Sequence, residues 1–82
     1  MDSDIKKTID LHGVACPMNF VKTKAALASL SPGDLLAVIL DEGDAILNVP
    51  LSVKEEGHRV VQVEDLGETF RVVIRKGPGP IA

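Results

Sequence analysis

Residues 8–19 read TIDLHGVACPMN, and this stretch predicts the change from a strand to a helix on which the fold depends. Apolar Ile9 and Leu11 alternate with polar neighbours over Thr8–His12, which indicates a strand that ends at Gly13. Pro17 favours the first position of a helix, where its missing N–H would have no partner anyway. Cys16 is therefore expected at or beside the N-cap of a helix.

The pattern continues on the C-terminal side of this stretch. Good helix formers predominate from Pro17 to Leu30, and Ser31–Asp34 ends that helix. The continuous apolar run Leu35–Leu40 is typical of a strand in the middle of a sheet. The acidic segment Asp41–Asp44 then predicts a turn.

The second half of the chain predicts one more helix and a hairpin. Because Pro50 disfavours the middle of a regular helix, we expect this helix at about Val49–Glu56, with Asn48 as its cap and Gly57 as its stop. Val and Ile recur with period two over 58–65 and 69–75, which predicts two antiparallel strands joined at 66–68.

The order strand, helix, strand, helix, strand, strand predicts a two-layer α/β sandwich. Two helices would cover one face of a four-stranded mixed sheet. We expect a single domain over residues 7–76, with flexible tails at 1–6 and 77–82.

Composition restricts the classes of function. The 82 residues carry a net charge of −3 and contain no Trp or Tyr, so neither a basic stripe nor stacking aromatics favour direct nucleic-acid binding. No apolar run approaches the roughly 18 residues of a membrane span, and we expect a cytosolic monomer. A structural zinc site needs four ligands, and the chain offers only one cysteine, Cys16, and two histidines, His12 and His58. Neither a metal nor another cofactor is therefore expected.

Cys16 is the candidate for chemistry. A thiol at a helix N-terminus faces unpaired N–H groups and the positive end of the helix dipole, and both favour the reactive thiolate. His12 is the histidine nearest to it in sequence. The alternative is that Cys16 is a small buried apolar residue without a chemical role.

The chain resembles the TusA/SirA family of sulfur-carrier proteins. The resemblance rests on Asp10–Pro17, Val21–Leu27, Ser31–Asp34, Gly57-His58 and Phe70–Lys76. It implies a sulfurtransferase-type carrier whose motif cysteine, Cys16, accepts sulfur as a persulfide from a cysteine desulfurase or similar donor. It also implies transfer to an acceptor protein in tRNA thiolation, cofactor synthesis or sulfur metabolism.

The motif departs from the family pattern at one position. The family's usual motif is Cys-Pro-x-Pro, whereas Asn19 stands here in place of the second proline. Unlike proline, Asn19 supplies a backbone N–H that we expect within reach of a sulfur at the N-cap. The alternative is that Asn19 is merely tolerated in the first turn.

Two further possibilities concern partners and function. Lys24 matches a basic position of the family and is a candidate for partner docking, although lysines on helices usually form a solvated face. The altered motif leaves open a regulatory or adaptor module without sulfur transfer. A thiol redox sensor is also open, but with one cysteine it would need an intermolecular or mixed disulfide.

Overall fold

The structure is a computed structural model that describes residues 5–15 and 18–77. Its elements follow the predicted order, which is thereby confirmed. In chain order they are β1 (Ile5–Asp10), α1 (Met18–Ala28), β2 (Leu35–Asp41), α2 (Asp44–Glu55), β3 (Arg59–Asp65) and β4 (Thr69–Arg75).

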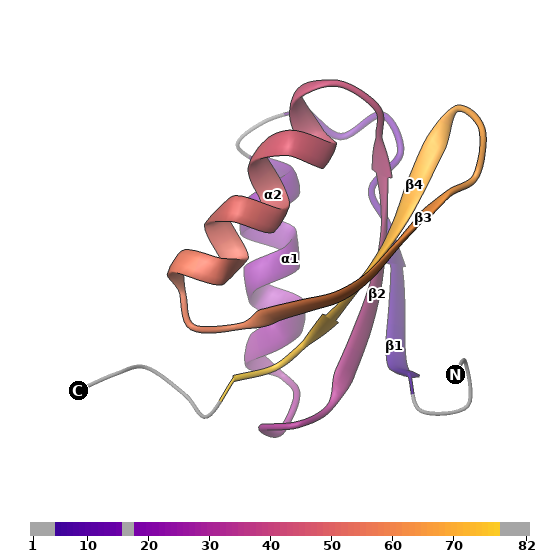
Figure 1. Cartoon of the computed structure of the whole chain (residues 1–82). Helices are drawn as coiled ribbons and strands as arrows, with labels where there is room; N and C mark the ends of the chain where they lie inside the picture. The colour runs from indigo at the N-terminus through magenta and orange to yellow at the C-terminus, as the bar shows by residue number, and fades with distance from the viewer. Residues whose placement is uncertain (1–4, 16–17, 78–82) are drawn as a thin grey trace.

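The four strands form one mixed sheet in the order β1-β2-β4-β3. β1 and β2 are parallel, as a connection through a helix requires, while β4 runs antiparallel to both of its neighbours. Both helices lie on the same face of the sheet and begin at the same end of the molecule (Figure 1). The predicted two-layer α/β sandwich is confirmed.

The core lies between the helices and the central strands. β2 pairs on both sides, and its Leu36, Val38 and Leu40 are fully buried against the helical layer. Val72 and Ile74 of β4 stand opposite Val38 and Leu36 and complete this surface. The apolar run of β2 thus forms a central strand, as predicted.

The observed α2 differs from the predicted helix. It begins at Asp44 after the N-cap Gly43, and Pro50 lies inside it. A proline within a helix removes one backbone hydrogen bond and costs about 3 kcal/mol. Ala45, Val49 and Val53, spaced four residues apart, are buried in the core, and burying such side chains stabilises by roughly 1.5 to 3 kcal/mol for each valine. Burial against the sheet therefore outweighs the local penalty.

The boundaries of β1 and α1 differ from the predicted ones by a few residues. β1 begins at Ile5, inside the segment expected to be a tail, because the start of β2 pairs with it at Leu35. It ends at Asp10, so that His12 lies beyond the strand. α1 ends at Ala28 rather than Leu30. Within the described ranges, no helix has the length and apolar character needed to cross a membrane.

Candidate functional site

The segment before Cys16 leaves the sheet after Leu11, which is still hydrogen-bonded to β2. The backbone N–H of Leu11 donates to the Ile39 carbonyl at 2.9 Å, which extends the pairing of β1 with β2 by one residue. The Leu11 side chain is 4% exposed and belongs to the core. The chain then turns: Val14 N–H donates to the Leu11 carbonyl at 3.0 Å, and Gly13 has φ of 79°, a conformation that glycine adopts without strain.

A carboxylate from the end of β2 holds this turn. Asp41 Oδ1 lies 2.6 Å from His12 Nδ1, and Asp41 Oδ2 accepts the Gly13 N–H at 2.8 Å. Asp10 Oδ1 in turn accepts the His12 N–H at 2.9 Å. Two acidic side chains thus fix consecutive residues of the segment. Because Asp41 is 29 positions from His12, no local spacing in the sequence indicates their pairing.

Cys16 and Pro17 lie outside the described residues, so the predicted N-cap position of the thiol stays a prediction. Their neighbours Ala15 and Met18 are exposed. The Asn19 N–H donates to the Ala15 carbonyl at 3.1 Å. The described residues before and after the cysteine are therefore tied to each other by a backbone hydrogen bond of helical spacing.

Asn19 forms three hydrogen bonds with described neighbours along the chain. Its backbone N–H donates to the Ala15 carbonyl, and its expected reach to the sulfur stays a prediction because Cys16 lies outside the described residues. Its side chain is 2% exposed, and Oδ1 accepts the Phe20 N–H at 2.7 Å. Its carbonyl accepts the Thr23 hydroxyl at 2.8 Å. Asn19 thus stabilises the first turn of α1 from the buried side.

Lys24 of α1 forms an ion pair with the residue that follows α2. Its Nζ lies 3.3 Å from Oε1 of Glu56, the residue that follows α2, and both side chains are well exposed. An exposed ion pair of this kind contributes at most about 1 kcal/mol. The predicted docking role of Lys24 remains a prediction, since this contact neither supports nor excludes it.

Several large apolar side chains of the two helices are exposed to solvent. Met18 and Val21 of α1 are each close to half exposed, and Leu47 and Leu51 of α2 are more exposed still. Leu47 and Leu51 share one face of α2 because they are four residues apart. These positions give the helical layer apolar surface on both helices.

No cluster of three or more metal-ligating side chains occurs in the ranges 5–15 and 18–77.

The fold and the sequence define a small α/β sandwich with a single cysteine two positions before Met18, the first residue of α1, and this class of domain does not by itself specify a reaction. The comparisons with known proteins are specific. The model of the family described as "Sulfurtransferase TusA" matches residues 7–76. The chain therefore belongs to the TusA sulfurtransferase family.

Its relatives are proteins of similar length. The chain is 38% identical over 74 residues to an Archaeoglobus fulgidus protein named "putative sulfur carrier protein", covering 89% of this chain and 84% of that one. A Thermotoga maritima protein with the same name is 38% identical over 63 residues, which cover 77% and 80% of the two chains. Escherichia coli "putative sulfur carrier protein YedF" is 34% identical over 68 residues, covering 83% and 88%.

Proposed function

We propose that Cys16 carries a sulfane sulfur atom as a persulfide between two partner proteins. The observation that carries this proposal is that the chain's single cysteine stands two positions before the first residue of α1 in a member of the TusA family. A helix N-terminus favours the thiolate form that such chemistry needs. The names of the relatives support the same class of function.

The transfer is balanced without an external oxidant or reductant. The Cys16 thiolate attacks the terminal sulfur of a donor's cysteine persulfide, the donor's S–S bond breaks, and the donor cysteine leaves as a thiolate. Cys16 then holds the new S–S bond. In the second step an acceptor thiolate attacks the terminal sulfur of Cys16, and Cys16 leaves as a thiolate.

The donor in this proposal is a cysteine desulfurase or a related persulfide enzyme, and the acceptor is a protein of tRNA thiolation, cofactor synthesis or sulfur metabolism. The cytosol is the compartment that suits a free thiol. Both partners must bring a cysteine to the same sulfur, so each must dock close to the start of α1. The exposed Met18 and Val21 supply apolar surface on that helix.

The experiment is a single-turnover transfer from the loaded protein to a candidate acceptor, followed by persulfide-specific alkylation of both chains. The persulfide label should leave the carrier as it appears on the acceptor, and Cys16→Ser should give no label on either. A parallel sample under mild oxidant distinguishes a redox sensor, which would form an intermolecular or mixed disulfide but take up no sulfur. Full biological activity of Cys16→Ala would instead support an adaptor.

A further inference from the structure

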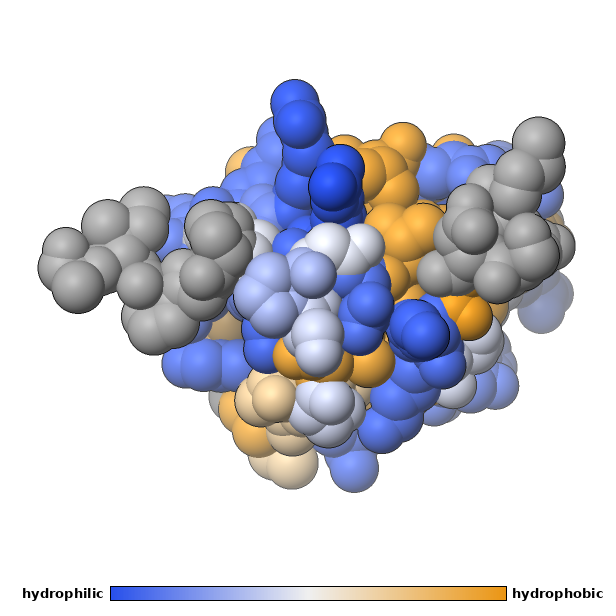
Figure 2. Space-filling model, turned by 90° about the horizontal axis from the view of Figure 1, so that it is seen from below, coloured by the Kyte–Doolittle hydropathy of each residue, from blue (hydrophilic) through white to orange (hydrophobic). Residues whose placement is uncertain are grey.

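A hollow of about 480 Å³ lies at the end of the sheet where β2 begins and β4 ends. The helices begin at the other end, so this hollow is remote from the start of α1 (Figure 1). Its lining includes three glycines and three basic residues, which are Gly33, Gly57, Gly77, Arg59, Arg75 and Lys76. Figure 2 views the molecule from this end and shows strongly hydrophilic side chains beside a hydrophobic patch.

Two arginines oppose each other across the strands at this hollow. Arg59 of β3 is the register partner of Arg75 of β4, and both side chains are exposed. Like charges directly opposite each other in a sheet are destabilising. Elsewhere on the same two strands, Arg71 stands opposite Glu64 and lies 3.3 Å from its carboxylate. Neither Arg59 nor Arg75 forms such an ion pair with any residue of the described ranges.

The backbone donors of the glycines are already used. Gly33 N–H donates to the Lys76 carbonyl at 2.9 Å, Gly57 N–H to the Lys54 carbonyl at 3.0 Å, and Gly77 N–H to His58 Nδ1 at 3.0 Å. An anion in the hollow would therefore depend on side-chain donors of the lining, which come from Arg59, Arg75 and Lys76.

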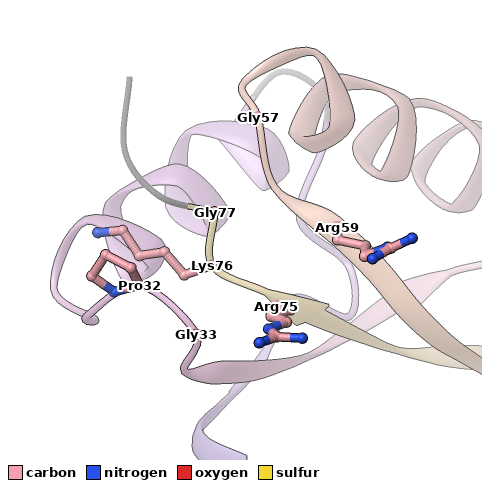
Figure 3. A pocket seen from close by; sticks show the side chains of 7 residues that line it. All are labelled: Pro32, Gly33, Gly57, Arg59, Arg75, Lys76 and Gly77. Atoms are coloured by element: carbon pink, nitrogen blue, oxygen red, sulfur yellow. The ribbon is translucent and has the colours of Figure 1, made fainter. Parts of the chain in front are cut away.

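Lys76 adds positive charge to the hollow, but its ammonium lacks the paired N–H donors of a guanidinium group. Its ammonium donates to the Leu30 carbonyl at 2.7 Å and points over Pro32, away from the two guanidinium groups (Figure 3). Burial and the positive charge of Lys76 lower the pKa of His58, which is consistent with a positive potential here. The nearby Asp34 carboxylate accepts the Ser31 N–H at 3.0 Å within its own turn.

Two of the glycines that line the hollow lie very close to each other. A Cβ at position 77 would fall on the Gly57 carbonyl oxygen, so only glycine lets the two backbone segments approach this closely. Gly33 has φ of 92° and also lacks a side chain that would fill the space. A ligand in the hollow would meet the backbone of the glycines on one side, with Arg59 at the start of β3 and Arg75 at the end of β4 beside it.

We propose that Arg59 and Arg75 form a binding site for a phosphate group, either free or as an ester. Guanidinium groups bind phosphate oxygens through paired N–H donors, and two opposed groups match its double negative charge. The anion would also relieve the repulsion between the two side chains. The hollow is larger than one anion, which leaves room for the organic part of an ester.

The test is an NMR titration of the whole chain with sodium phosphate, with chloride added to hold the ionic strength constant. Amide signals of Gly33, Gly57 and Arg75 should shift and saturate, and Arg59→Gln or Arg75→Gln should each raise Kd about tenfold. Lys54→Gln removes an exposed charge from α2 and is the matched control. Shifts that do not saturate, or that all three variants weaken equally, would overturn the proposal.

A second set of titrations identifies the source of the phosphate group. Tighter binding of a nucleoside monophosphate or a short RNA than of inorganic phosphate, lost in the same arginine variants, assigns the site to an ester. Equal or weaker binding of these esters assigns it to the free anion. A thermal melt provides an independent readout, since phosphate should raise the Tm of the wild type and of Lys54→Gln but not of the arginine variants.

Discussion

His12 Nδ1 lies 2.6 Å from Asp41 Oδ1, and this contact joins the segment after β1 to the end of β2. The other oxygen of the same carboxylate accepts the Gly13 N–H at 2.8 Å. One side chain therefore fixes two consecutive residues, three and four positions before Cys16. The segment before the cysteine is therefore anchored on the sheet at His12 and Gly13, in addition to the bond between Ala15 and Asn19 of α1.

Replacing Asp41 should loosen this loop. Asp41→Asn keeps the shape of the side chain but removes its charge, so we expect the free energy of unfolding to fall by about 1 kcal/mol. The Gly13 amide should also exchange faster with solvent, as measured by hydrogen-exchange NMR. Glu42→Gln removes the neighbouring exposed charge and is the control. Unchanged exchange at Gly13 in Asp41→Asn would show that the carboxylate does not hold the turn.

Asn19 should matter for stability through its buried side chain. Asn19→Ala leaves the Phe20 N–H without the acceptor that lies at 2.7 Å, and losing a buried hydrogen-bond partner costs about 1 to 3 kcal/mol. Chemical denaturation of the variant measures this fall. Asn48→Ala, at an exposed position of α2, should change the free energy of unfolding by much less. Equal effects of the two substitutions would contradict the role given to the Asn19 side chain.

Lys24 should affect partner binding more than folding. Its pair with Glu56 is exposed, so Lys24→Gln should lower the free energy of unfolding by only about 0.5 kcal/mol. If Lys24 contacts the sulfur donor, the Kd for that donor should rise several-fold. Isothermal titration calorimetry compares it with Lys54→Gln, which leaves α1 unchanged. The docking prediction fails where both variants bind the donor as the wild type does.

His58 should make stability depend on pH. Burial, followed by the charge of Lys76, lowers its pKa below the ordinary 6.5, and its Nδ1 accepts the Gly77 N–H only in the neutral form. The unfolded chain therefore binds the proton more readily. The stability that His58 contributes is present above pH 6.5 and is lost as the pH falls through its lower pKa in the folded state.

The variant His58→Asn isolates this effect, because its amide oxygen offers a similar acceptor that does not titrate. Denaturation curves between pH 5 and pH 7.5 should show a steeper loss of stability in the wild type than in the variant. Parallel pH profiles of the two proteins would mean that His58 does not couple to folding.

Patterns of hydrophobic residues predicted the order of the elements and the layers. The unbroken apolar run of β2 follows from its burial in the middle of the sheet, whereas the burial of β3 and β4 does not follow the period of two, since β3 is mostly exposed and β4 buries three consecutive residues. Local rules failed at Pro50, because they do not include the burial of Val49 and Val53 against the sheet.

The site was only partly predictable. Cys16 and its position before a helix come from sequence alone, and so does the departure at Asn19. The pairing of His12 with Asp41 depends on two strand ends that meet in space, and the inward direction of Asn19 depends on the packing of α1. The pairing leaves no signal at short spacing, whereas Asn19 does stand at helical spacing from Thr23 and Leu27, which are buried on the same face.

The central claim is that Cys16 accepts a sulfur atom, and intact-protein mass spectrometry tests it most directly. The protein is incubated with a cysteine desulfurase and cysteine, with Cys16→Ser as the control. We predict a gain of the mass of one sulfur atom, reversed by a reductant and absent from the control. No gain with several desulfurases, or the same gain in Cys16→Ser, would contradict the assignment of Cys16 as the acceptor of their sulfur.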